Sequence, residues 1–274
     1  MPISALLLAL AAAVVHAIWN LLLSGEEDVH SATAVAITFG VVVFAPVAAL
    51  TWRLQWAALP FVAGSSALEG LYLVLLASAY SVAAMGFVYP IARGSAPVLV
   101  LVANVIAFGA YVSALAAIGV VLVAAGIVLV RGLRVSASPR DLSLALSIGA
   151  CIAGYTLVDK HGIVHGAPIS YLELVFGMTA AAYVTGVWRA RGGVAIRAAI
   201  SPPSLLAGIG FFGAYALTLA ALKLASAASV AAVRESSVLI ATVALAIGGR
   251  ERIGLPRLGG AAAVVAGIAL ISLG

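Results

Sequence analysis

Long apolar runs separated by short polar connections are the feature that most restricts the fold of this chain. Ten such runs occur, at about residues 3–23, 32–51, 59–79, 86–106, 110–130, 142–160, 168–188, 203–223, 226–247 and 257–273. A helix that crosses a bilayer needs about 20 apolar residues. The runs contain Gly and Pro and lack the alternation of membrane strands, which excludes a barrel. We therefore expect an all-α integral membrane protein with ten transmembrane helices.

The composition agrees with a bilayer location. Of the 274 residues, 65% are hydrophobic and only 8% are charged, whereas a soluble domain has about 25% charged residues. A single cysteine, Cys151, excludes an internal disulfide. The first apolar run has full spanning length and no basic start, so we expect no cleavable signal peptide.

The chain repeats itself at an offset close to half its length. The matched positions, each 141 residues apart, include Arg93 and Arg234, Ser95 and Ser236, Gly119 and Gly260, and Gly126 and Gly267. The two halves, residues 1–137 and 138–274, would then hold five helices each. Because five is odd, the second half must be inverted relative to the first. Two inverted five-helix repeats are typical of secondary transporters.

Basic residues predict an orientation. The connections after the fifth, seventh and ninth runs carry nine arginines: Arg131, Arg134, Arg140, Arg189, Arg191, Arg197, Arg250, Arg252 and Arg257. The opposite ends of the runs carry Arg53, Lys160 and Lys223. Arginine-rich connections stay in the cytoplasm, so we expect both chain ends outside it. The sequence pI of 9.7 therefore reflects topology rather than nucleic-acid binding.

Ionisable residues within the apolar runs are the main candidates for function, because an arginine at membrane depth costs roughly 3 kcal/mol or more. Five lie well inside the runs: Glu69, Arg93, Glu173, Arg234 and Glu235. Glu69 is close to the middle of its run. It either pairs with Arg93 and holds two helices together, or contacts a solute or a coupling proton, and the two roles are compatible.

The two arginines are expected to differ in role. Arg93 lies between Pro90 and Pro97, which predicts a kinked helix beside a cavity and a contact with solute. Adjacent residues project about 100° apart on a helix, so Arg234 is not expected to pair with Glu235. Glu173 is its expected partner, and Glu173 and Arg234 would form a structural ion network.

Glu235 replaces the Gly94 of the first half. An acid present in one half only is a better candidate for solute binding than a repeated residue.

Aromatic and polar side chains complete the predicted binding site. His16, Trp19 and Asn20 are spaced so that they share one helix face, and Tyr72 and Tyr80 follow Glu69 along another stripe. Tyr89 precedes Arg93, Tyr155 aligns with His16, and Tyr215 aligns with Tyr72. We predict that these residues line a cavity, although His16 also fits a packing residue held by hydrogen bonds.

The repeated glycines predict close helix packing. Gly119 and Gly126, like Gly260 and Gly267, are seven residues apart, and small residues at such spacing allow close approach of membrane helices. The two helices that carry them should pack against each other or against a second copy of the chain.

Three motifs resemble one known family. The stretch His16-Ala17-Ile18-Trp19-Asn20 is similar to the His-Ala-x-Trp-Asn signature of an EamA-type branch of the drug/metabolite transporter superfamily. Tyr89-Pro90-Ile91-Ala92-Arg93-Gly94 and Arg234-Glu235-Ser236-Ser237 resemble motifs in the fourth and ninth helices of that branch. The resemblance covers the whole chain. It implies a ten-helix bundle that moves small metabolites, often amino acids, commonly outward.

These observations predict an inner-membrane carrier of small organic solutes that works by alternating access. Amino-acid export is the specific expectation, with aromatic amino acids included and protons as possible partners. A membrane-embedded enzyme acting on a lipid-linked phosphate is the alternative, but it would need clustered charges near one interface. The sequence has no P-loop and predicts no enzyme activity, no cofactor, no metal site and no nucleic-acid partner.

Overall fold

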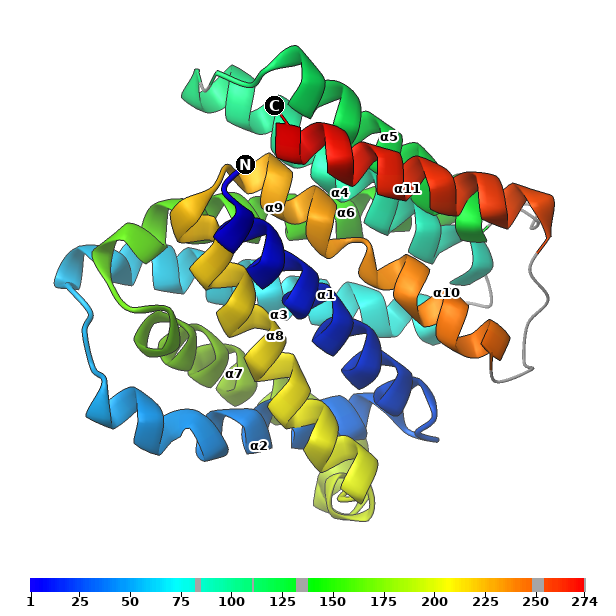
Figure 1. Ribbon diagram of the computed structural model, residues 1–274. Coiled ribbons are helices and arrows are strands. Elements are labelled where there is room, and N and C mark those ends of the chain that lie inside the picture. Colours follow the sequence, from blue (N-terminus) through cyan, green and yellow to red (C-terminus); the bar gives the residue numbers. More distant parts are fainter. Residues whose placement is uncertain (82–84, 110, 132–137, 248–253, 274) are drawn as a thin grey trace.

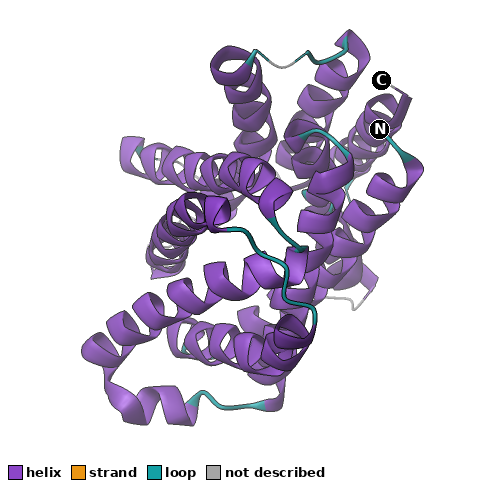
Figure 2. Cartoon of the chain, turned by 90° about the vertical axis from the view of Figure 1, so that its left-hand side faces the viewer, coloured by secondary structure: helices purple, strands orange, loops and turns teal. Residues whose placement is uncertain are grey.

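The computed structural model describes residues 1–81, 85–109, 111–131, 138–247 and 254–273. Within these ranges the chain is helical, with short loops and no strand (Figure 2). The α-helices are α1 (Ile3–Ser24), α2 (Val29–Leu50), α3 (Leu59–Ser81), α4 (Met85–Phe108), α5 (Ala114–Arg131), α6 (Pro139–Gly162), α7 (Pro168–Ala198), α8 (Pro202–Leu224), α9 (Ala227–Arg234), α10 (Ser237–Ile247) and α11 (Leu255–Leu273). Two 3-10 turns, η1 (Trp56–Ala58) and η2 (Ile163–His165), precede α3 and α7. Each of the ten predicted helices is present, the ninth as two pieces.

The helices fit a multi-pass membrane protein. Five of them, α1, α2, α3, α6 and α8, are long and apolar enough to cross a membrane. Shorter apolar segments occur in α4, α5 and α11. Large apolar side chains such as Leu7, Val42, Ile106 and Leu206 are exposed on the outside of the bundle. Lipid can cover such a surface, whereas water would not favour it.

Capping residues determine where several helices begin. Asp28 accepts a hydrogen bond from the backbone N–H of Ser31 at the start of α2. Ser138 and Ser201 form capping boxes at the starts of α6 and α8, and both helices have proline in the first turn. These side chains satisfy N–H groups that have no partner within the helix, which keeps the helix ends well defined.

Helices α5 and α11 pack against each other, as the glycine spacing predicted (Figure 1). A methyl group on Gly119 would lie 2.6 Å from the carbonyl oxygen of Gly267, and one on Gly126 would lie 2.7 Å from that of Gly260. Any larger residue would force the two backbones apart. Of the two predicted partners, the structure therefore selects the other helix of the same chain.

The seventh predicted helix is longer in the structure than expected. The seventh was expected to end near residue 188, but α7 continues to Ala198 with a break at Gly192, whose φ is 79°. A glycine adopts this left-handed conformation without the strain that a side chain would cause. The last turn of α7 therefore leaves the line of the main helix.

The structure contains one helix break that the sequence did not predict. α4 is a single helix from Met85 to Phe108 and includes Pro90 and Pro97. The ninth predicted helix, in contrast, is interrupted at Glu235 and Ser236, between α9 and α10. Residues 227–247 contain neither Pro nor Gly, so backbone propensity does not explain this interruption. It coincides with the buried side chain of Glu235, which is 0% exposed.

The two ends of the bundle are held differently. At one end, the segment before α3 joins the segment before α7: Gln55 donates its N–H to His165 (2.9 Å) and Ala167 donates to Arg53 (2.7 Å). Lys223 adds a bond to the carbonyl of Gly166. We call this the clasped end. The N-terminal amine donates to the carbonyl of Ile271 (3.2 Å), so the start of α1 lies near the last turn of α11 (Figure 1).

The opposite end carries the described arginines of the predicted cytoplasmic face. Here Arg191 pairs with Asp28 at 2.8 Å, and Ser201 donates to Glu26 at 2.6 Å. A groove of about 570 Å³ lies in this half of the bundle between α3 and α7, with His30 and Arg191 at its mouth. A hollow of about 400 Å³ also lies at the clasped end, beside Arg53 and Lys223.

Candidate functional site

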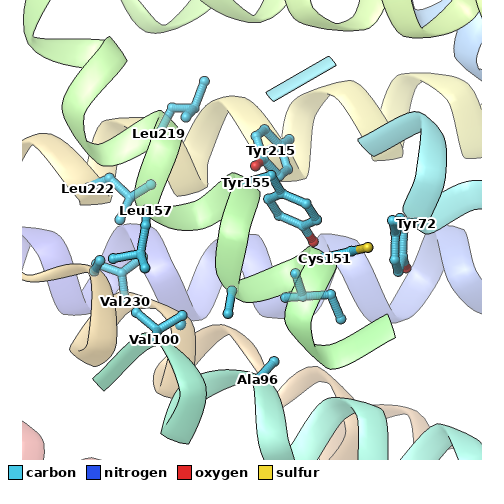
Figure 3. Close-up of a cluster of buried hydrophobic side chains, with 14 of the residues drawn as sticks. Tyr72, Ala96, Val100, Cys151, Tyr155, Leu157, Tyr215, Leu219, Leu222 and Val230 are labelled. Atoms are coloured by element: carbon cyan, nitrogen blue, oxygen red, sulfur yellow. The ribbon is translucent and has the colours of Figure 1, made fainter. Parts of the chain in front are cut away.

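A small cavity lies in the interior of the bundle, between α1, α3, α6, α8 and α9. Its wall consists of His16, Trp19, Glu69, Tyr72, Tyr155, Phe211, Ala214, Tyr215, Thr218 and Arg234. In Figure 3, Tyr72, Tyr155 and Tyr215 lie to one side of the buried cluster, and aliphatic side chains such as Leu219 and Leu222 to the other. The cavity leaves about 10 Å³ for water-sized molecules, which is about enough for one water. A solute could enter only after the helices move.

Arg93 pairs with Glu235, whereas the sequence had offered Glu69 as its partner. Arg93 Nη1 lies 3.1 Å from each carboxylate oxygen of Glu235. The two side chains are 3% and 0% exposed. They join α4 to the break between α9 and α10 across 142 residues of sequence. A buried charge pair of this kind persists only with good geometry, because both ions have lost their water.

His16 extends this pair to α1. Its Nε2 lies 2.7 Å from Arg93 Nη2. An arginine can only donate, so Nε2 accepts the bond and His16 is a neutral imidazole with its proton on Nδ1. His16 is therefore held by a hydrogen bond, which fits a packing residue. Its ring also lines the cavity.

Arg234 contacts Glu235 despite being its neighbour in sequence. Its Nη2 lies 3.4 Å from Glu235 Oε1 and 3.4 Å from the hydroxyl of Tyr155. Adjacent side chains on a continuous helix would point about 100° apart. Here the helix ends, and both side chains turn into the interior. The guanidinium also lies 5.9 Å and 6.0 Å from the ring centres of Tyr155 and Tyr215, within the range of cation–π attraction.

Glu173 is not part of this cluster, which corrects the predicted ion network. Its Oε2 is buried without a hydrogen-bond partner among the described residues. Arg234 contacts Tyr155 and Glu235 instead. The network is therefore Arg93, Glu235 and Arg234, with His16 attached.

Trp19 lies between this cavity and a second hollow. It makes edge contacts with His16 and Phe211, with ring centres 4.7 Å and 4.9 Å apart. Trp19 and Phe211 also border the second hollow, together with Asn20. The three residues of the first motif thus lie close together, but Asn20 contacts the neighbouring hollow and not the cavity wall.

Glu69 and Tyr72 are buried on the cavity wall, at 2% and 4% exposure. Tyr72 is 6.0 Å from Tyr155, ring centre to ring centre. The side chains of Tyr80 and Tyr89 belong to the part of the chain that the structure does not describe. Of the predicted stripe on α3, the part that the structure describes faces inward.

Asp159 is a buried acid that sequence reasoning missed. It is 0% exposed and accepts hydrogen bonds from Tyr171, at 2.9 Å, and from Tyr215. It lies near the end of its helix, where an acid usually faces water. The repeat carried a usable signal, because an offset of 139 places Asp159 against Asn20 of the first motif.

Comparisons with known proteins establish the fold. No protein-family profile and no curated protein matches the sequence. A solved structure titled "Crystal structure of protein" is similar over 98% of this chain and 98% of its own length, with a TM-score of 0.76 and 18% sequence identity. At this identity the similarity extends to the arrangement of the helices. The cavity and its charges are properties of this chain.

Proposed function

We propose that the chain is a secondary transporter that moves small zwitterionic metabolites, amino acids above all, by alternating access across the inner membrane. The observation that carries this proposal is the buried cluster of Arg93, Glu235 and Arg234 beside an interior cavity. Charges at membrane depth are expensive and occur where they line a path for polar solutes. The break between α9 and α10 supports it, since interrupted helices form the solute sites of many transporters.

The cavity wall presents both signs of charge and aromatic surface. Arg234 suits a carboxylate, Glu69 suits an ammonium group, and Tyr72, Tyr155 and Phe211 suit an apolar or aromatic side chain. Amino acids carry all three groups. This match favours an amino acid over a sugar or nucleoside, which has no permanent charge to pair with the buried arginine and glutamate.

The two differently held ends support alternating access. The clasped end is held together by backbone hydrogen bonds between the segments before α3 and α7. The groove and the second hollow both lie toward the opposite end. The transport cycle that we propose opens the cavity toward the arginine-bearing end first, then releases the clasp.

The family proposal rests on the three motifs and on the fold. We propose that the chain is an EamA-type member of the drug/metabolite transporter superfamily, built from two inverted five-helix halves. Reciprocal glycine contacts between α5 and α11, the fifth and last predicted helices, support this symmetry. A C-terminal reporter that is active only in the cytoplasm should stay dark, and a bright one would reverse the proposed orientation.

Counterflow in proteoliposomes tests the function directly. Vesicles loaded with unlabelled amino acids, nucleosides or sugars should accumulate the matching labelled solute, and the amino acids should give the largest signal. Glu69→Gln removes the charge of the acid on the cavity wall and should lower counterflow about 10-fold or more. Glu27→Gln, in the exposed loop before α2, serves as the control. Native protein that exchanges no amino acid would overturn the proposal.

A further inference from the structure

The two arginines of the charge cluster differ in how many of their donors are used. Arg93 donates to both oxygens of Glu235 and to His16. Arg234 makes two long contacts of 3.4 Å, both from Nη2. An arginine has five N–H donors in a fixed fork, so Arg234 retains capacity for another acceptor.

One of these remaining donors is the Nε of Arg234. It is buried and has no hydrogen-bond partner among the described residues, and the residue as a whole is 3% exposed. Arg234 lines the cavity, whereas Arg93 and Glu235 are not part of its wall. Buried donors are almost always satisfied in folded proteins, so this donor on the cavity wall is available to an acceptor that enters the cavity.

A second donor on the same wall has the same property. Trp19 is 6% exposed, and its indole Nε1 is buried without an acceptor. A tryptophan in an interior usually has a partner for its N–H. Two unpaired N–H donors on one cavity wall, one of them on a cation, match a group that carries negative charge on oxygen.

We infer that Arg234 Nε and Trp19 Nε1 form the subsite that binds the carboxylate of the solute, in the cavity that Glu69 also lines. This inference rests on the proposed transport function and specifies its chemistry. Solutes with a carboxylate bind here, and related amines without one bind weakly. Arg93 acts on the solute only indirectly, through Glu235, which contacts both arginines.

The subsite fills when the cavity expands. Trp19 and Phe211 separate the cavity from the second hollow. A displacement of their two rings joins the spaces and moves the indole with its N–H, so binding of the carboxylate is coupled to opening of the cavity.

Binding of three related probes by the purified protein tests the subsite. L-phenylalanine carries both charged groups, phenethylamine lacks the carboxylate, and 3-phenylpropionate lacks the ammonium group. Trp19→Phe keeps an aromatic ring and removes the N–H, and Arg234→Lys keeps the charge and removes Nε. Trp188→Phe and Arg189→Lys, at exposed positions of α7, are the matched controls.

The expected result is selective for the carboxylate. Each cavity variant should bind L-phenylalanine and 3-phenylpropionate about 10-fold more weakly, which corresponds to one lost hydrogen bond to a charged group. Phenethylamine binding should change less than about 2-fold, and the control variants should bind all probes normally. If Arg234→Lys does not fold, Trp19→Phe decides the matter alone.

The contrary results separate the two proposals. Equal weakening of all three probes, or none, in a folded Trp19→Phe protein overturns the carboxylate subsite and leaves the transporter intact. Native protein that neither binds nor exchanges L-phenylalanine or any other amino acid overturns the proposed function.

Discussion

Arg93 and Arg234 occupy matching positions of the sequence repeat, yet their surroundings differ. After Arg93 comes Gly94, which lets the uninterrupted α4 pack closely on α5: a methyl group there would lie 3.1 Å from the carbonyl oxygen of Ala124. After Arg234 comes Glu235, where the helix is interrupted and the carboxylate is buried. Arg93 therefore makes short contacts to Glu235 and His16. Arg234, in contrast, makes two contacts of 3.4 Å and has an Nε without a partner among the described residues.

The most severe test of this difference is to remove Glu235, the acid that both arginines contact. Glu235→Gln leaves two buried cations without a carboxylate, and loss of one partner of a buried pair costs about 3–5 kcal/mol. We expect the largest drop in thermal midpoint of any single variant here, measured in detergent. Arg93→Gln combined with Glu235→Gln should cost less than the two single changes added together, and simple additivity would contradict the pairing.

Separate variants of the two arginines sharpen the comparison. Arg93→Gln removes both short contacts to Glu235, so it should lower stability by about 3 kcal/mol. Arg234→Gln removes only contacts of 3.4 Å and should lower stability less, while it abolishes most counterflow. This order is the reverse of the one that the prolines around Arg93 predicted. Stability losses in the opposite order would restore the earlier assignment.

The glycine beside Arg93 provides a smaller test. Ala is favoured over Gly in a helix by about 1 kcal/mol, so Gly177→Ala, where a methyl group meets nothing within 4 Å, should stabilise the protein slightly. Gly94→Ala crowds the backbone of α5 and should fall below that control by about 1–3 kcal/mol. Equal thermal midpoints for the two variants would show that α4 and α5 are not closely packed there.

The smallest effect is expected at the surface pair of Asp28 and Arg191. Partial burial acts to raise the pKa of Asp28, but hydrogen bonds from Ser31 and the nearby Arg191 guanidinium hold it below its ordinary value. Because the folded protein has the lower pKa, the carboxylate stabilises it fully above about pH 4. That contribution disappears as the pH falls through the lower, folded-state value.

Asp28→Asn should therefore cost less than about 1 kcal/mol at pH 7. Urea or thermal unfolding at pH 7 and near pH 3 measures this, and the difference between variant and native protein should shrink at the lower pH. A loss as large as that of Glu235→Gln would show that burial is not what makes the interior cluster costly to break.

Hydropathy by itself determined the helical plan. Membrane-length apolar runs predicted all ten helices to within a few residues at most ends, because the bilayer imposes a length and a polarity on each segment separately. The glycine spacing predicted the packing of α5 on α11 for a similar reason, since close approach of two backbones needs small residues on each. The inward position of Glu69 and Tyr72 also followed from the helical period alone.

Only the tertiary structure decided which charges meet. The sequence offered Glu69 to Arg93 and Glu173 to Arg234, but the relative positions of α4, α9 and α10 bring Glu235 to both arginines. The tertiary structure also interrupts the ninth predicted helix at a place without Pro or Gly. It buries Asp159, which accepts hydrogen bonds from Tyr171 and Tyr215. Hydropathy and periodicity are local properties of one helix, whereas the partner of a buried ion depends on how several helices are placed around it.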